Sequence, residues 1–376
     1  MDLALCLYKY FPYGGLQRDF LRIARACQAR GHHVRVYVLS WDGEPPTDLE
    51  VVRLPARGFA SPARYRRFSR ALAAHLAQRP VDAVVGFNKM PGLDIYYAAD
   101  PCYANKAHTQ RSALYRLLPR YRHFARYEAA VFGPAARTQI LMISSVQEPL
   151  FRHHHRTPPE RFHLLPPGID PSRRAPPDAA GVRAAFRAEF GLDAAQRLLL
   201  MVGSGFRTKG LDRVLRGLAA LPATLSDVQL FVIGQDDPKP FQRLARRLGV
   251  AQRVRFFAGR DDVPRFLQGA DLLVHPAYSE NTGTVLLEAL VAGLPVLTTA
   301  NCGYAHHVVE AGAGAALPEP YEQDAFDQAL VALLAGDRGA LRARALAWAA
   351  TADIYGLPER AAALIEQLAP GARRPT

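Results

Sequence analysis

The sequence lacks any hydrophobic run near the roughly 20 residues that a membrane-spanning helix needs, although 49% of its 376 residues are hydrophobic. Its four cysteines, at positions 6, 27, 102 and 302, form no CxxC pair, which argues against a disulfide framework and a cysteine zinc site. The amino-terminal stretch MDLALCLYKYFPYGG has neither a basic leader nor a small-residue cleavage site, so we expect a first strand there and not a signal peptide. These absences together predict a globular cytoplasmic protein.

Acidic side chains are fewer than basic ones, 34 against 47, and this leaves a net charge of +13. The excess predicts attraction to phosphate in a nucleic acid, an anionic lipid, a nucleotide or a phosphorylated sugar. Nucleic acid is disfavoured, because no basic stripe with base-stacking aromatics occurs outside residues 108–133. The sequence shows no Ser-His-Asp triad and no metal-ligand spacing. Three consecutive histidines at 153–155 lie in an Arg-flanked polar helix end, where we expect no metal.

The length suits two domains better than one ordinary core. Strand-like apolar runs alternate with helical patterns on both sides of a proline-rich connector at about 166–180, which predicts parallel βαβ units in two open α/β domains. In such sheets ligands bind beyond the carboxyl ends of the strands, and two such domains form a cleft. The expected strands are 3–8, 33–40, 82–87, 138–144, 161–166, 196–205, 228–234, 253–259, 271–276 and 295–299. The expected helices are 15–30, 64–79, one from about 210, 240–248, 262–269, 284–292 and 357–368.

Glycines mark two of the expected strand-to-helix turns, YFPYGGLQRDF (10–20) and VGSGFRTKGLDR (202–213). Glycine lets backbone amides approach a ligand, and a helix N-terminus favours an anion. In the second turn Arg207 and Lys209 lie close to Gly203, and two cations there suit a diphosphate. The P-loop and GxGxxG spacings are absent. The alternative is that these are ordinary βα turns that hold no ligand.

Two carboxylates, Glu280 and Glu288, flank the start of an expected helix in HPAYSENTGTVLLEALVAGLPVLTT (275–299). The polar loop 281–284 between them offers free backbone amides for a phosphate or for sugar hydroxyls. A carboxylate accepts two hydroxyl hydrogen bonds, so Glu288 suits a ribose diol and Glu280 suits a hexose. Together these features describe a nucleotide-sugar site. The alternative is a pair of surface acids that favour the helix dipole.

The E-x7-E segment ENTGTVLLE, with GSGFRTKG and PPGID, resembles the retaining GT-B glycosyltransferases of family 4. LYKYFPYGGLQRDFLRIA, GFNKMPGLDIYYAAD, YRHFARYEAAVF, HLLPPGI and GLPVLTTANCGYAHH are similar to the lipopolysaccharide core glycosyltransferases within that family. The resemblance runs from the first strand to the C-terminal helix. It implies an α/β GT-B fold, with two Rossmann-like domains facing each other across a cleft and a C-terminal helix crossing back to the N-terminal domain. The expected parts are an acceptor-binding domain at 1–167, a nucleotide-sugar domain at 168–352 and the returning helix at 353–376.

The resemblance also implies roles for individual residues. Glu288 would bind the donor ribose, Glu280 the hexose hydroxyls, and Lys209 the diphosphate, with Arg207 or Arg173 as a second cation. The backbone near Arg260 and Asp261 would read the uracil. The expected catalytic residues are Glu280, Asp19, Asp100 and Lys209. The expected donor-binding residues are Gly15, Arg173, Gly203, Arg207, Lys209, Arg260, Asp261, Asn281, Thr282, Gly283, Thr284, Val285 and Glu288.

The expected reaction is retaining transfer of a hexose from a UDP-sugar to an inner-core heptose of lipopolysaccharide, with no metal and no cofactor beyond the co-substrate. The departing phosphate would help to take the proton of the acceptor hydroxyl. ENTG replaces the EAAG form of glucose-transferring relatives, so the donor stays open between UDP-glucose and UDP-N-acetylgalactosamine. The alternatives are a transferase to another lipid or polyol, a nucleotide-sugar epimerase, and a non-catalytic membrane-binding scaffold of the same fold.

A basic, aromatic segment at 108–133 has helical spacing of its apolar residues, and Pro119 should restart a helix within it. Such a helix suits an anionic membrane surface, or else a buried face with a solvated basic rim. The resemblance favours the membrane and implies a contact segment at 103–132, with the protein peripheral on the cytoplasmic leaflet of the inner membrane. The expected contacts are Lys106, Arg111, Tyr115, Arg116, Arg120, Tyr121, Arg122, Phe124 and Arg126.

Overall fold

The computed structural model describes residues 1–12, 14–56, 58, 60–193 and 195–370. The chain divides into two compact units, here called unit 1 and unit 2. Unit 1 combines Met1–Gly168 with the segment that begins at Tyr355, and unit 2 spans Ile169–Ile354. These limits lie one or two residues from the domain boundaries expected above. The expected final residues 371–376 lie outside the described part of the chain.

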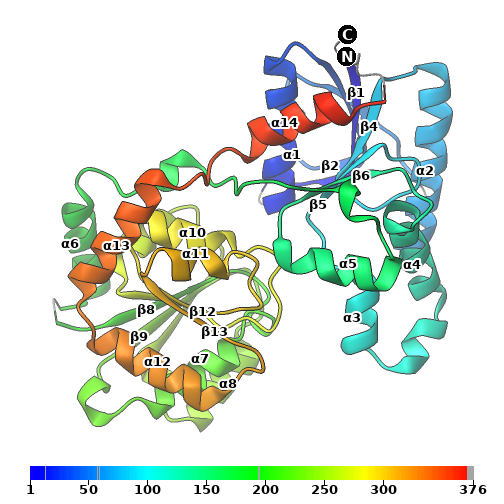
Figure 1. Ribbon diagram of the computed structural model, residues 1–376. Coiled ribbons are helices and arrows are strands. Elements are labelled where there is room, and N and C mark those ends of the chain that lie inside the picture. The colour runs from blue at the N-terminus through cyan, green and yellow to red at the C-terminus, as the bar shows by residue number, and fades with distance from the viewer. Residues whose placement is uncertain (13, 57, 59, 194, 371–376) are drawn as a thin grey trace. The chain divides into compact units, whose positions relative to one another are not determined.

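Unit 1 contains a seven-stranded sheet in the order β3-β2-β1-β4-β5-β6-β7, and every pairing in it is parallel (Figure 1). Its strands are β1 (Asp2–Tyr10), β2 (His33–Trp41), β3 (Glu50–Arg53), β4 (Ala83–Gly86), β5 (Ile95–Ala98), β6 (Gln139–Met142) and β7 (Phe162–Leu164). Its helices are α1 (Gly15–Ala29), α2 (Ser61–Gln78), α3 (Tyr103–Thr109), α4 (Pro119–Phe132), α5 (Glu148–His155) and α14 (Leu357–Leu368).

Alternation along β1 explains how helices cover both faces of this sheet. Leu3, Leu5 and Leu7 belong to one apolar cluster with α1 and α14. The intervening Ala4, Cys6 and Tyr8 belong to a second cluster with α2, α4 and α5. Successive strand side chains point to opposite faces, so a strand that is apolar at every position requires a helix layer on each side. The helix near the C-terminus therefore completes the core of unit 1, as the resemblance implied.

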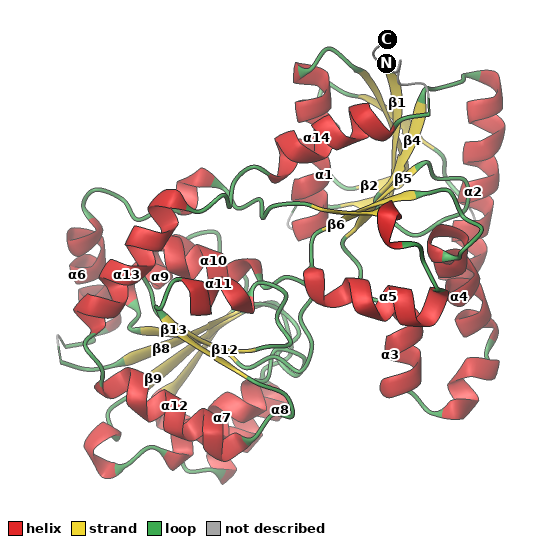
Figure 2. Cartoon of the chain, in the orientation of Figure 1, coloured by secondary structure: helices red, strands yellow, loops and turns green. Residues whose placement is uncertain are grey.

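Unit 2 contains a six-stranded parallel sheet in the order β10-β9-β8-β11-β12-β13 (Figure 2). Its strands are β8 (Leu198–Val202), β9 (Gln229–Ile233), β10 (Val254–Phe257), β11 (Leu272–His275), β12 (Val296–Thr299) and β13 (Gly314–Leu317). Its helices are α6 (Ala179–Phe190), α7 (Leu211–Ala220), α8 (Lys239–Arg247), α9 (Val263–Gly269), α10 (Thr284–Val291), α11 (Ala305–Glu310), α12 (Gln323–Ala335) and α13 (Arg338–Thr351). Two parallel α/β sheets confirm the expected fold class.

The expected strands and helices are found, but the sequence reading missed the strands β3, β5 and β13 and several helices, among them α3, α6 and α11. The missed strands β3, β5 and β13 have four residues each. The helix α6 begins at Ala179, inside the connector that was expected to have no periodicity. No helix in the described ranges combines the length and the apolarity needed to cross a membrane.

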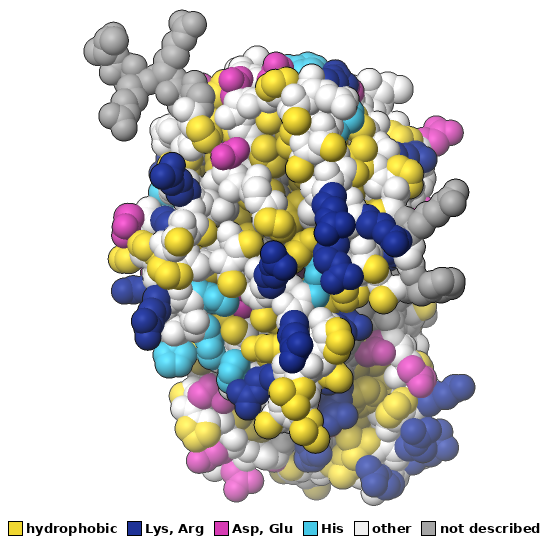
Figure 3. Space-filling model, turned by 90° about the vertical axis from the view of Figure 1, so that its right-hand side faces the viewer, with side chains coloured by type: hydrophobic (Ala, Val, Ile, Leu, Met, Phe, Trp, Pro, Cys, Tyr) yellow, Lys and Arg dark blue, Asp and Glu magenta, His cyan; other side chains and the backbone are white. Residues whose placement is uncertain are grey.

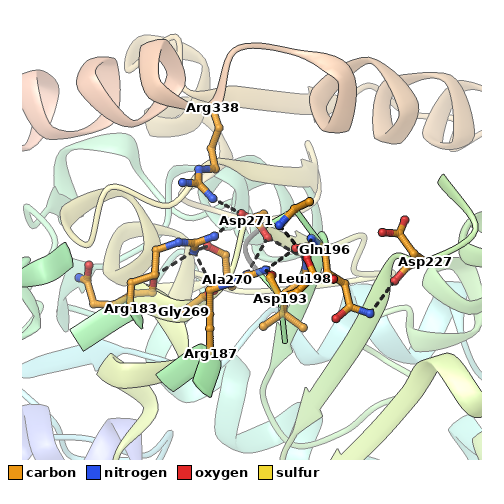
Figure 4. A network of polar contacts seen from close by, with 12 residues as sticks. Arg183, Arg187, Asp193, Gln196, Leu198, Asp227, Gly269, Ala270, Asp271 and Arg338 are labelled. Carbon is orange, nitrogen blue, oxygen red and sulfur yellow. Dashed lines mark hydrogen bonds and ion pairs between the residues drawn. The ribbon is translucent and has the colours of Figure 1, made fainter. Parts of the chain in front are cut away.

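A buried carboxylate organises the amino-terminal edge of the unit 2 sheet, which is the edge away from the expected ligand site. Figure 4 shows Arg183, Arg187 and Arg338 converging on Asp271. Arg183 donates to Asp271 at 2.7 Å, and Asp271 also accepts the backbone N–H of Leu198 at 2.8 Å. Burial by itself would raise the pKa of Asp271, but the Arg183 guanidinium and the other donors outweigh burial and lower it. This network fixes the end of α9 against the start of two central strands.

Candidate functional site

The loop before α10 lies at the carboxyl end of β11, and no side chain caps the backbone N–H groups at the start of the helix. Gly283 is the N-cap of α10 at φ +81°. Because the first N–H groups of a helix have no partner within it, Thr284 and Val285 present donors at this end. The backbones of Glu280 and Cys302 form an isolated parallel β-bridge. Tyr304 also donates its backbone N–H to the carbonyl of Thr282 at 2.8 Å. The loop can therefore hold an anion without rearranging its backbone.

Glu280 and Lys209 meet at this loop. The Lys209 ammonium contacts the carboxylate of Glu280, and both side chains are largely buried. Burial lowers the pKa of Lys209. His275, at the end of β11, places Nε2 3.4 Å from the same carboxylate. The sequence reading did not predict a role for His275, although His275 and Pro276 come directly before this loop in the sequence.

His275 is fully buried, and its environment fixes its charge. Burial first, and then the nearby Lys209 ammonium, lower the pKa of His275 to about 3. The imidazole is therefore neutral at physiological pH. A neutral ring with its proton on Nε2 can donate to Glu280, and its Nδ1 then has no hydrogen-bond partner within the described residues. His275 thus positions the carboxylate without adding charge to the site.

Glu288 lies one turn inside α10 and pairs with a different cation. Its carboxylate is 3.5 Å from Nε of Arg173, and both side chains are mostly buried. Arg207, the other expected second cation, is exposed and has no ion pair within the described ranges. The structure therefore brings Arg173 to Glu288 and Lys209 to Glu280, while Arg207 remains on the rim.

The glycine turn after β8 is joined to the loop after β11. Gly203 has φ +137°, and Gly210 at φ +81° lies so close to Pro276 that a Cβ would strike its carbonyl oxygen. Tyr278 donates its backbone N–H to the carbonyl of Thr208 at 2.8 Å. Because β8 and β11 are neighbours across which the strand order reverses, the two loops meet at the topological switch point of the sheet. Open α/β sheets bind ligands at such a point.

Arg213 fixes this junction, and the sequence reading missed its role. Its guanidinium lies 3.6 Å from the ring centres of both Tyr278 and Tyr321. Nη1 of Arg213 also donates to the carbonyl of Pro276 at 3.0 Å. A stacked, charge-bearing side chain of this kind holds the first residues of the Glu280 loop against α7.

Arg260 and Asp261 follow β10 at the same carboxyl edge. The Arg260 guanidinium bonds the carboxylate of Asp262 at 2.6 and 2.8 Å and lies 5.0 Å from the Phe266 ring centre. Asp261 is exposed. The side chain of Arg260 is therefore engaged locally, and the expected contact of this turn's backbone with uracil stays a prediction.

The expected site residues of unit 1 follow β1 and β5. Gly15 opens α1 after the uncapped Gly14, so the first N–H groups of that helix are available to an anion. Tyr97 donates its hydroxyl proton to Asp19 at 2.7 Å, and burial raises the pKa of Asp19 even against that hydrogen bond. Asp100 is exposed and lines a cavity of about 330 Å³.

The expected membrane-contact segment consists of three short helices. They are α3, a 3₁₀ helix at Ala113–Leu117, and α4, which begins at Pro119 as predicted. Leu114, Leu117 and Leu118 are 73%, 64% and 48% exposed. The chain turns at Ser112 and Leu118, so the expected restart of a helix at Pro119 is confirmed, and the residues before it form two separate short helices.

Basic and aromatic residues of this segment contact one another in pairs. Arg111 lies over the Tyr115 ring and Arg120 over the Phe124 ring, each 5.6 Å from the ring centre. Figure 3 shows a face of unit 1 on which Lys and Arg side chains stand among hydrophobic ones. Exposed leucines beside cations are typical of surfaces that meet an anionic interface.

Two groups of side chains have metal-ligand types close together. Cys102, Glu128 and His155 place one ligand atom each within 4.8 Å of one another. However, Lys89 already pairs with Glu128 at 2.5 Å, and burial raises the pKa of Cys102 to about 12, so that the thiol keeps its proton. This group fits a structural ion pair better than a metal. The second group is the more exposed cluster His306, His307 and Glu310 on α11.

Comparison with known proteins places the chain among glycosyltransferases. Residues 13–173 match the model described as Glycosyltransferase Family 4, and residues 182–347 match Glycosyl transferases group 1. The chain is 48% identical over 368 residues to the lipopolysaccharide glucosyltransferase WaaG of Escherichia coli K12, covering 97% of this chain and 98% of that one. It is 34% identical over 213 residues, about half of each chain, to D-inositol 3-phosphate glycosyltransferase of Mycolicibacterium gilvum.

Solved structures give the same picture of the fold. A crystal structure of WaaG superposes with a TM-score of 0.89 at 48% identity, covering 96% of this chain and 99% of that one. Anabaena Alr3699/HepE in complex with UDP-glucose superposes with a TM-score of 0.72 at 16% identity, covering 98% and 100%. The second likeness, at that identity, concerns the fold alone.

Proposed function

Because this chain belongs to the family 4 glycosyltransferases that include the lipopolysaccharide glucosyltransferase WaaG, we propose that it transfers a hexose from a UDP-sugar to an inner-core heptose of lipopolysaccharide. The observation that carries the proposal is the 48% identity to WaaG over 97% of this chain. The site geometry supports it, because the paired acids, cations and free helix N–H groups suit the parts of a nucleotide-sugar.

The donor would replace the two ion pairs of unit 2. Its ribose hydroxyls would hydrogen-bond to Glu288, and its hexose hydroxyls to Glu280. Its diphosphate would take the Lys209 ammonium and the N–H groups at the start of α10, with Arg173 as the second cation because it already lies 3.5 Å from Glu288. Each cation thus exchanges a protein carboxylate for a phosphate, and the two released carboxylates accept hydrogen bonds from sugar hydroxyls instead.

The chemistry would rest on charge placement. Lys209 and the α10 N–H groups would stabilise the negative charge that develops on the departing diphosphate, which would in turn help to take the proton of the acceptor hydroxyl. Glu280, held by His275, would fix the orientation of the hexose. These cations and N–H groups are sufficient in type to neutralise a diphosphate, so the proposed reaction needs no metal.

The protein would meet its lipid acceptor at the anionic leaflet of the inner membrane from the cytoplasmic side. The exposed leucines and the cations of the segment at 103–132 support this part of the proposal, since apolar insertion and attraction to anionic lipid act together in interfacial binding.

Calorimetric titration tests the donor half of the proposal directly. UDP-glucose and UDP-N-acetylgalactosamine are titrated without metal into the wild type, into Glu288→Ala, and into Glu310→Ala, which is a control acid on the exposed end of α11. We expect one donor to bind the wild type and the control, and to bind Glu288→Ala at least about tenfold more weakly. Equal affinity in wild type and Glu288→Ala would remove the ribose role of Glu288. Failure of both donors to bind would overturn the proposed function.

A further inference from the structure

A cavity in unit 1 is lined only by residues of that unit, and none of these residues belongs to the proposed donor site. It has a volume of about 330 Å³, within the usual range for small-molecule sites. Tyr8 reaches it from β1, Asn88 and Lys89 from the loop after β4, and Asp100 from the loop after β5. The order of the sheet reverses between β1 and β4, so this cavity occupies the switch point of unit 1, where such sheets bind ligands.

Aromatic rings form much of the wall of the cavity. Tyr8 and Tyr65 stack with their ring centres 3.9 Å apart and their planes 4° from parallel. Tyr103 and Phe124 lie with their ring centres 5.5 Å apart, and Phe124 is 6.3 Å from Tyr65. Tyr65, Tyr103 and Phe124 are only partly buried. Flat apolar faces beside polar hydroxyls suit the C–H face of a sugar ring, which is apolar while its edge is polar.

The polar part of the cavity has an excess of positive charge. Lys89 is neutralised by Glu128 at 2.5 Å. Lys106 and Arg120 are exposed at the cavity, and neither forms an ion pair with any residue that the structure describes. Against these two free cations stands the single carboxylate of Asp100. The cavity therefore favours a ligand with a negative charge and with hydroxyl groups that a carboxylate can accept.

The wall of the cavity is preorganised. The backbone N–H of Tyr8 donates to the Asn88 side chain at 2.8 Å, and the Tyr8 hydroxyl donates to the carbonyl of Lys89 at 3.3 Å. Glu128 binds Lys89 and also accepts the N–H groups of Tyr103 and Ala104, at 2.7 and 2.8 Å. These bonds give a structural role to Asn88 and Lys89, the NK pair of the segment GFNKMPGLDIYYAAD. Neither residue has a role in the proposed donor site. A rigid wall reduces the entropy lost when a ligand binds.

We propose that this cavity binds an anionic sugar unit of the acceptor, with the ring against Tyr65, Tyr103 and Phe124 and its phosphate or carboxylate group on Lys106 and Arg120. The inference rests on the proposed function, since it takes the acceptor to be a saccharide. It adds that the acceptor is recognised through a negative charge on a sugar, independently of its lipid chains.

The test uses full-length enzyme and an inner-core oligosaccharide freed of its acyl chains, without vesicles. Acceptor KM, donor KM and kcat are measured for wild type, Lys106→Gln, Arg120→Gln and Tyr65→Ala. Arg70→Gln is the matched control, because Arg70 is an exposed cation on the helix that carries Tyr65 and does not line the cavity. We expect each of the first three variants to raise acceptor KM about tenfold while donor KM and kcat stay close to wild type. Arg70→Gln should behave as wild type.

Two treated acceptors identify the source of the charge. Removal of phosphate, or reduction of the sugar carboxyl groups, should raise the wild-type KM and abolish the difference between wild type and Arg120→Gln for whichever group is bound. Unchanged acceptor KM in both Lys106→Gln and Arg120→Gln overturns the inference. Weaker binding of the same two variants to anionic vesicles would then show that these cations contact a lipid headgroup instead. Failure of wild type to transfer sugar to the untreated oligosaccharide or to the intact acceptor lipid would overturn the proposed function itself.

Discussion

Glu128 offers a quantitative test of the interior of unit 1. Its fully buried carboxylate accepts hydrogen bonds from Lys89 at 2.5 Å and from the backbone of Tyr103 and Ala104, and it lies 2.8 Å from Nε2 of His155. Burial by itself would raise the pKa of Glu128, but Lys89 and the hydrogen bonds outweigh it and lower the pKa from 4.5 to about 2. At 1.36 kcal/mol per unit, this difference corresponds to about 3 kcal/mol of preference for the charged form in the folded state.

We therefore expect Glu128→Gln to lower the free energy of unfolding of unit 1 by about 3 kcal/mol at neutral pH. A glutamine turns an NH₂ group toward a site built from donors, so Lys89 loses its counter-charge and at least one N–H loses its acceptor. Because the folded pKa of Glu128 is depressed, its stabilisation is present above the unfolded value of 4.5 and is lost as the pH falls toward about 2. The gap between wild type and variant should thus be constant above about pH 6 and should narrow below about pH 5.

Urea unfolding monitored by hydrogen exchange measures this effect in unit 1 separately, since a chain with two units need not unfold in one step. Glu160→Gln is the control, because Glu160 is exposed and forms no ion pair within the described part of the chain. The control should unfold as wild type does. A loss in Glu128→Gln smaller than about 0.5 kcal/mol, or a loss equally large at pH 7 and pH 4, would refute the reasoning.

Three further predictions concern unit 2 and the membrane-contact segment. His275→Phe removes the N–H that points to Glu280, and kinetics should show about fivefold lower kcat, the equivalent of one hydrogen bond, with a nearly unchanged melting temperature; equal losses of activity and stability would indicate packing alone. Asp271→Asn should lower the melting temperature of unit 2 in calorimetry. Because the pKa of Asp271 is lowered in the folded state, its carboxylate stabilises unit 2 above the ordinary pKa of about 3.9. This stabilisation is lost as the pH falls through the folded pKa. An Asp271→Asn variant as stable as wild type at pH 7 would contradict the prediction. Flotation with anionic vesicles should recover more protein than with neutral vesicles, and high salt should reduce the difference; equal recovery would contradict membrane contact.

Local sequence signals were sufficient for most of the architecture, because a fully buried parallel strand is a continuous apolar run and its crossover helix has a separate period. The strand β1, apolar from Leu3 to Tyr8, shows this directly. The signals failed for β3, β5 and β13, which have four residues each and are recognised by their parallel pairing with β2, β6 and β12. They did mark the start of α4 at Pro119, where a helix was expected to restart.

The same distinction applies to the site. Glu280, Glu288, Lys209 and the uncapped Gly283 could be predicted, since each belongs to a loop whose chemistry is readable from adjacent residues. His275 and Arg213 could not, because their roles arise from contacts between segments that are far apart in sequence. The ring of His275 is informative only once Lys209, 66 positions earlier, is known to share the carboxylate of Glu280. A neutral histidine there adds no charge to a site in which Glu280 balances Lys209 and Glu288 balances Arg173. A variant that alters His275 should therefore change how the hexose is held and leave the charge balance for UDP intact.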